Sequence, residues 1–127
     1  MNKYTGLLAA IVLAAFSRTT IASMNDDSSF IKNAGFCYMY ATRLTQTSDS
    51  GLQFRGVNLF SRFNGQIFKI ILNKMDKSYG APWVNANFQK GNAEAMSLSS
   101  SDLIYNKKYF QSCEAFADHA EKEYRSQ

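Results

Sequence analysis

The chain has 127 residues, of which 46% are hydrophobic, and a formal net charge of +4. This length supplies enough apolar side chains for one compact domain and excludes two. The charge gives no support to nucleic-acid binding, because removal of residues 1–22, which include Lys3 and Arg18, would lower the net charge to +2.

Residues 1–22 are predicted to form a secretory signal peptide. Lys3 supplies the positive start, Leu7–Phe16 is an unbroken apolar run, and the small residues of Thr20–Ala22 favour cleavage before Ser23. A helix that spans a bilayer needs roughly 20 apolar residues, so a retained membrane anchor is the weaker alternative. We therefore expect an exported protein of the bacterial periplasm, without stable membrane insertion after cleavage.

Residues 23–127 are then expected to form one helical domain. Its first helix should begin near Asp27 or Ser28, because these residues are good helix caps. Its apolar positions follow helical spacing: Phe30, Ala34, Cys37, Ala41 and Leu44. Gly35 lies inside this helix, which indicates close packing against another backbone.

A second helix is predicted over residues 52–78. Its apolar positions recur in steps of three and four over about five turns: Val57, Phe60, Phe63, Ile67, Ile71 and Met75. Gly56 and Gly65 inside it are each unfavourable by about 1 kcal/mol relative to Ala, so the packing of the apolar face has to offset them.

A third helix is predicted over residues 82–97, with two shorter pieces as the alternative because Asn and Gly are frequent there. A closing helix is predicted over residues 101–124, with a bend near Asn106. Its core-facing positions are Tyr109, Cys113, Phe116 and Ala120. The expected fold is all-α, a small antiparallel bundle of about four helices.

The two cysteines, Cys37 and Cys113, lie on the apolar faces of the first and last predicted helices. In an oxidising compartment an even number of cysteines favours a disulfide, so we predict that this bond links the two helices. Two free thiols or a metal pair are the alternatives, but few further ligands exist for a metal.

The sequence indicates no catalytic site. His119 is the only histidine, and an exposed surface residue is its simplest interpretation. The usual metal-ligand spacings, the nucleophile elbow and the haem attachment motif are missing. We expect neither an enzyme nor a bound metal or cofactor.

Charged residues form two regular rows. Basic residues recur every seven positions along the second predicted helix: Arg55, Arg62 and Lys69. Acidic residues recur on the closing helix: Glu114, Asp118 and Glu121. The rows either face each other as weak surface pairs or dock a protein partner. For the docking alternative, the predicted binding residues are Arg55, Arg62, Lys69 and Trp83.

In layout the chain resembles the periplasmic immunity proteins of type VI secretion amidase effectors. The shared features are a signal peptide, cysteines in the first and last helices, and the Gly35-Phe36-Cys37 segment. This resemblance implies a protein that binds and inhibits a toxin acting in the periplasm, and it assigns no binding residues. The alternatives are a carrier or sensor of a small apolar ligand, and an accessory factor of an envelope secretion or assembly system.

Overall fold

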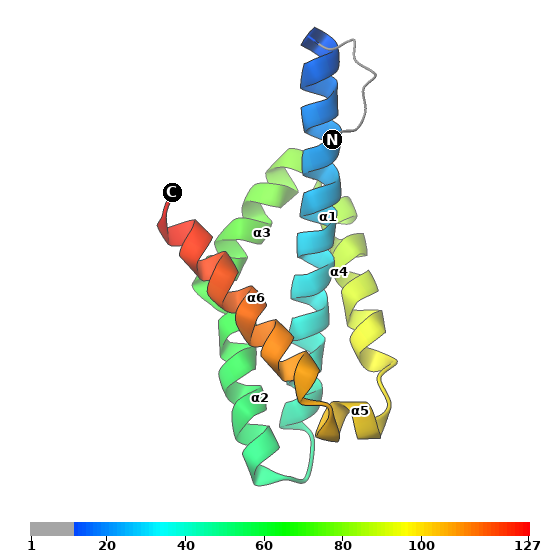
Figure 1. The fold of residues 1–127 in the computed structure, drawn as a ribbon, viewed down its shortest axis with the longest axis vertical. Coiled ribbons are helices and arrows are strands. Elements are labelled where there is room, and N and C mark those ends of the chain that lie inside the picture. The colour runs from blue at the N-terminus through cyan, green and yellow to red at the C-terminus, as the bar shows by residue number, and fades with distance from the viewer. Residues whose placement is uncertain (1–11) are drawn as a thin grey trace. The chain divides into compact units, whose positions relative to one another are not determined.

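The computed structural model describes the backbone of residues 12–127 and the side chains of residues 24–127. Over this part the chain is all-helical, as predicted (Figure 1). Its six helices are α1 (Val12–Thr45), α2 (Ser50–Phe63), α3 (Gln66–Tyr79), α4 (Ala81–Met96), α5 (Ser100–Tyr105) and α6 (Lys107–Arg125). The signal peptide predicted for residues 1–22 lies largely outside the described residues and stays a prediction.

The chain divides into two compact units, Met1–Phe30 and Ile31–Gln127. In the first unit the described backbone is helical from Val12 onward. The predicted helix start at Asp27 or Ser28 is therefore wrong, because both residues lie inside α1. No Gly or Pro interrupts the segment between Val12 and Asp27, so nothing in the backbone opposes a continuous helix there.

The single helix predicted over residues 52–78 is also wrong. The chain breaks at Asn64 and Gly65, which end α2 and begin α3. Phe63 and Phe68 would point about 140° apart on a straight helix of 3.6 residues per turn. The break lets both rings enter one core, with their centroids 4.7 Å apart.

The later elements follow the predictions more closely. The third helix is one continuous segment, α4, and the chain bends at Asn106, which separates α5 from α6. The Asn106 side chain accepts a hydrogen bond from the backbone N–H of Lys108 and so caps α6. These two breaks replace the predicted four helices with six over the described residues.

The predicted disulfide is present between Cys37 of α1 and Cys113 of α6, whose Cα atoms lie 5.6 Å apart. Both cysteines are buried. Aromatic rings of these and other helices also contact one another. They include two groups: Phe36, Tyr40 and Tyr109; and Phe63, Phe68 and Phe116. The disulfide thus joins the first and last helices inside the core.

Helices α1 and α4 approach each other closely in the second unit. A Cβ atom on Gly35 would overlap the carbonyl group of Phe88, and one on Gly91 would overlap that of Lys32. Neither position therefore admits a side chain while the two backbones keep this distance. The prediction that Gly35 marks close backbone packing is confirmed.

Helix α2 packs on α1 through Gly56 rather than through its neighbour Val57. Gly56 is buried, and a Cβ atom there would meet Ala41, Leu44 and Thr45 of α1. Val57 is 55% exposed, so its predicted place in the core is wrong. This rotation of α2 directs other side chains of the helix toward α6.

Candidate functional site

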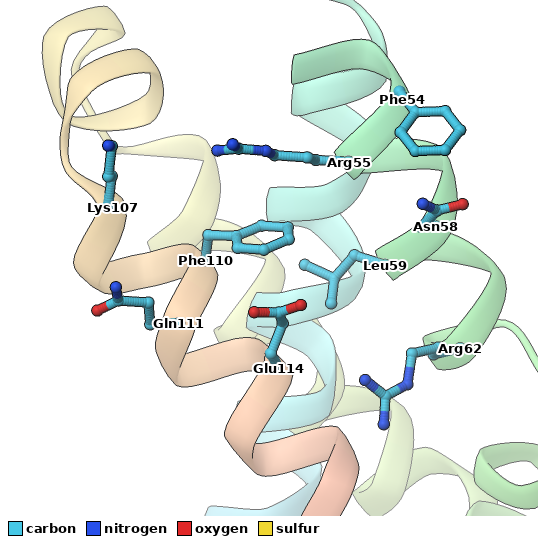
Figure 2. Close-up of a pocket in the computed structure, with 9 residues that line it drawn as sticks. All are labelled: Phe54, Arg55, Asn58, Leu59, Arg62, Lys107, Phe110, Gln111 and Glu114. Atoms are coloured by element: carbon cyan, nitrogen blue, oxygen red, sulfur yellow. The ribbon is translucent and has the colours of Figure 1, made fainter. Parts of the chain in front are cut away.

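A groove lies between α2 and α6, two helices that are in contact (Figure 2). Its volume is about 580 Å³. The residues that line it are Phe54, Arg55, Asn58, Leu59 and Arg62 of α2, and Lys107, Phe110, Gln111 and Glu114 of α6. We call it the α2–α6 groove.

The two walls of this groove run in the same direction. Arg55 of α2 lies over the Phe110 ring of α6, and about two to three turns further along each helix Arg62 meets Asp118 and Glu121. The expected antiparallel packing therefore does not hold for this pair of helices. Because the walls are parallel, residues near the start of both helices meet at one end of the groove.

That first end is positively charged and partly apolar. The Arg55 guanidinium lies 5.7 Å from the centre of the Phe110 ring, a cation–π distance. In Figure 2, Lys107 and Arg55 stand at the same end, above Phe110. Within the described part of the chain neither cation forms an ion pair. Phe54, at this end too, is 67% exposed.

Arg55 also lies near the buried phenol of Tyr40. Burial raises the pKa of Tyr40 from 10.0 to about 12, and the positive charge of Arg55 opposes this shift. Tyr40 stays neutral at ordinary pH because its anion would be poorly solvated. At ordinary pH Tyr40 therefore offers no negative charge to Arg55.

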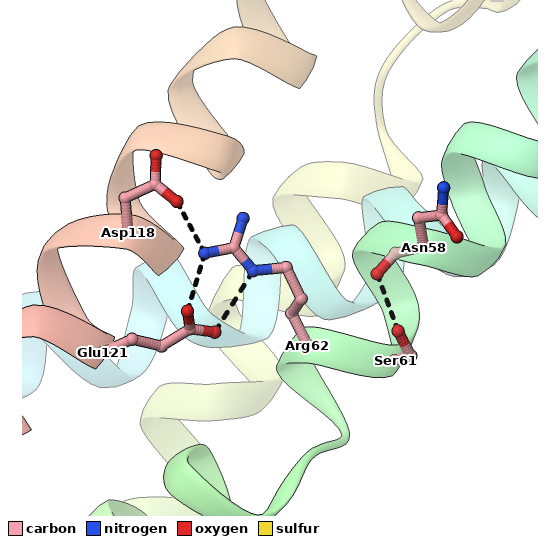
Figure 3. Close-up of polar contacts among 5 residues, drawn as sticks. All are labelled: Asn58, Ser61, Arg62, Asp118 and Glu121. Atoms are coloured by element: carbon pink, nitrogen blue, oxygen red, sulfur yellow. Dashed lines mark hydrogen bonds and ion pairs between the residues drawn. The ribbon is translucent and has the colours of Figure 1, made fainter.

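The other end of the groove holds a paired cation (Figure 3). Arg62 donates through Nε and Nη2 to the two carboxylate oxygens of Glu121, at 3.1 and 2.9 Å, and through Nη2 to Asp118, at 2.6 Å. The hydrogen bonds to Glu121 raise the pKa of Arg62 further above its ordinary value, although partial burial opposes them. With one cation and two carboxylates, this cluster carries a net negative charge.

Glu114 adds to the negative charge at this end. Its side chain is exposed, and no cation within the described residues pairs with it. It lies seven residues, or two turns of α6, beyond Lys107. The groove therefore passes from a positive end to a negative end over about 10 Å.

The structure brings only two of the four predicted binding residues together. Arg55 and Arg62 line the groove, but Lys69 is exposed on α3 and does not. Trp83 lies at the junction of α3 and α4, where its ring packs on Tyr79 at 4.5 Å. The break at Gly65 separates Lys69 from the row that the heptad spacing predicted.

The two aromatic residues of the groove, Phe54 and Phe110, are not among the binding residues predicted from the sequence. Phe54 is five residues from the buried Leu59, which places the two about 140° apart around α2. Had Leu59 and Gly56 been taken as the core face, the spacing would have placed Phe54 outside it. Arg62 forms ion pairs with Asp118 and Glu121. For these residues the structure agrees with the alternative that the basic and acidic rows face each other as weak surface pairs.

The described residues include no group of three or more His, Cys, Asp or Glu side chains placed to hold a metal ion. His119 is exposed on α6. Among the helices that the structure describes, none is both long enough and apolar enough to cross a membrane. Comparison with protein-family models, with curated proteins and with solved structures finds no match.

Proposed function

We propose that this chain is an exported protein-binding module that docks its partner in the α2–α6 groove. The observation that carries the proposal is the pair of cations, Arg55 and Lys107, that flank an exposed aromatic surface without carboxylate partners among the described residues. Aromatic and Arg side chains are enriched at the centres of protein interfaces, and unpaired charges steer a complementary partner.

The disulfide supports the exported location within this proposal. Disulfides persist in oxidising compartments such as the bacterial periplasm and are rare in the cytosol. Cys37 and Cys113 are joined across 76 residues and are shielded from solvent, as expected of a structural bond. We therefore propose a periplasmic protein, exported through a cleaved signal peptide.

The proposed action is inhibition of a toxin that works in the periplasm, as the layout resemblance implies. In this proposal the groove acts by binding alone. A carrier of apolar ligands would need an enclosed chamber. The α2–α6 groove instead opens to solvent between two helices.

The test is affinity capture from periplasmic extract with three versions of the protein. These are the unchanged chain, the variant R55E/K107E, and a matched control, K69E/K90E. Lys69 and Lys90 are exposed on α3 and α4 outside the groove, so both variants change the net charge equally.

The proposal predicts that the unchanged chain and K69E/K90E capture the same protein in stoichiometric amount, whereas R55E/K107E does not. The captured protein should be a cell-wall hydrolase or another toxin whose activity falls when the unchanged chain is added. Equal capture by all three versions would contradict docking in the groove. Capture of a non-toxic envelope component in its place would favour the accessory-factor alternative.

A further inference from the structure

Both walls of the α2–α6 groove are helices, so the side chains that line it recur every three or four residues. Side chains line it at positions 55, 58 or 59, and 62 on α2, and at positions 107, 110 or 111, and 114 on α6. Side chains spaced three and four residues apart form ridges along a helix. A third helix can pack the ridges of its own side chains into the grooves between them. An extended segment has a repeat of two and would match neither wall.

The charges along the groove have a direction as well. Arg55 and Lys107 make one end positive, and Glu114 lies two turns further along α6. On the α2 side of this second end, the charge of Arg62 is offset by its ion pairs with Asp118 and Glu121 of α6. The partly exposed ring of Phe110 lies between the two ends (Figure 2).

We infer that the docking element of the partner is an amphipathic helix with an acidic residue and a basic residue seven positions apart on one face, separated by apolar residues. The acidic side chain meets Arg55 and Lys107, and the basic side chain meets Glu114. The apolar residues between them cover the ring of Phe110. This inference rests on the proposed function and adds the chemistry and spacing of the partner.

The spacing follows from the geometry of an α-helix. Seven residues span about 10.5 Å along a helix axis and return to nearly the same face. Lys107 and Glu114 are themselves seven residues apart on α6, so a helix packed at a shallow angle in the groove needs the same interval. An interval of four residues brings only one of the two charges into place.

The probes are three fluorescein-labelled peptides of equal length with capped ends, whose binding is measured by fluorescence anisotropy at low salt. The first carries Glu and Lys seven residues apart with Leu at the two intervening face positions. The second has the same composition with Glu and Lys four residues apart. The third carries Lys at both charged positions. Each is titrated with the unchanged protein and with R55E/K107E.

The unchanged protein should bind the first peptide about five- to tenfold more tightly than the other two, because the misplaced or like charges lose or oppose an ion pair. Added salt should reduce this preference. The variant R55E/K107E should reverse the order and bind the Lys/Lys peptide best. This reversal tests charge recognition even if R55E/K107E is somewhat less stable.

Equal affinity of the unchanged protein for all three peptides would overturn the inference. So would an absence of measurable binding to any peptide. If R55E/K107E then still abolished capture of the natural partner, the groove would remain the docking surface and only the partner chemistry would be wrong. Self-association of the chain that R55E/K107E abolishes would instead identify a second copy as the occupant, which also contradicts the inference.

Discussion

Arg43 of α1 donates a hydrogen bond of 2.7 Å to the carbonyl oxygen of Ala95 near the end of α4. The same Nη1 atom also donates to the carbonyl of Leu98, at 2.9 Å. The last carbonyls of a helix lack partners within that helix, and they carry the negative end of its dipole. Arg43 therefore gives the carbonyls at and just after the end of α4 a hydrogen-bond donor, and its positive charge offsets the negative end of the helix dipole.

Replacement of Arg43 by Met should lower the free energy of unfolding by about 1–2 kcal/mol, because the half-buried carbonyls lose a charged donor. Urea denaturation followed by circular dichroism measures the change. The control is Lys90→Met, at an exposed position of α4, which should leave the midpoint nearly unchanged. Equal midpoints for both variants would show that Arg43 does not stabilise the end of α4.

Gly35 and Gly91 should not tolerate Ala, because the added Cβ atoms would overlap carbonyl groups of the opposite backbone. We expect each substitution to lower the free energy of unfolding by roughly 2 kcal/mol or more, the scale of overpacking in a core. Gly51→Ala is the matched control, since Gly51 is exposed near the start of α2. Thermal midpoints of the three variants test this, and unchanged midpoints for G35A and G91A would mean that α1 and α4 lie further apart.

Removal of the disulfide should have the largest effect on stability. A bond that closes a loop of 76 residues contributes about 4–5 kcal/mol in the chain-entropy model. The variant C37A/C113A should therefore lose most of the stability of so small a domain, as measured by urea denaturation against the unchanged oxidised protein. Mass spectrometry without reductant should show Cys37 linked to Cys113, and two alkylatable thiols in exported material would contradict the disulfide.

Stability should fall at alkaline pH through Tyr40. The pKa of this phenol is near 10 in the unfolded chain and about 12 in the folded one, so folding favours the protonated form. The contribution of this pKa shift to the free energy of unfolding is complete below pH 10 and is lost as the pH rises through 12. The variant Y40F should match the unchanged protein in urea midpoint at pH 7 and should lose less stability between pH 10 and 12. Equal losses of stability in both proteins between pH 10 and 12 would show that Tyr40 is not the cause of the loss.

The helical class and the disulfide were predictable from the sequence, because both depend on residue types at helical spacing. Cys37 and Cys113 lie at the centres of apolar stripes, and any packing that buries those stripes brings the two thiols near each other. The break at Asn106 was predictable for a similar local reason, since Asn caps a following helix through its own side chain.

The groove was not predictable, because it depends on how far α2 is rotated against α1. Gly56 permits a close approach that turns Val57 outward, and an apolar pattern alone favours the opposite assignment. The break at Gly65 then moves Lys69 out of line with Arg62. Sequence spacing found the two charged rows, but only the packing shows that Arg62 forms ion pairs and that Arg55 forms none with the residues that the structure describes.

The most direct test of docking in the α2–α6 groove is lysine acetylation of the protein, free and in complex with its captured partner, read by mass spectrometry. Lys107 lies in the groove, whereas Lys69 and Lys90 are exposed on α3 and α4. Our account predicts that complex formation protects Lys107 strongly and leaves Lys69 and Lys90 as reactive as in the free protein. Unchanged reactivity of Lys107, with protection of Lys69 or Lys90, would place the partner on another face and contradict the account.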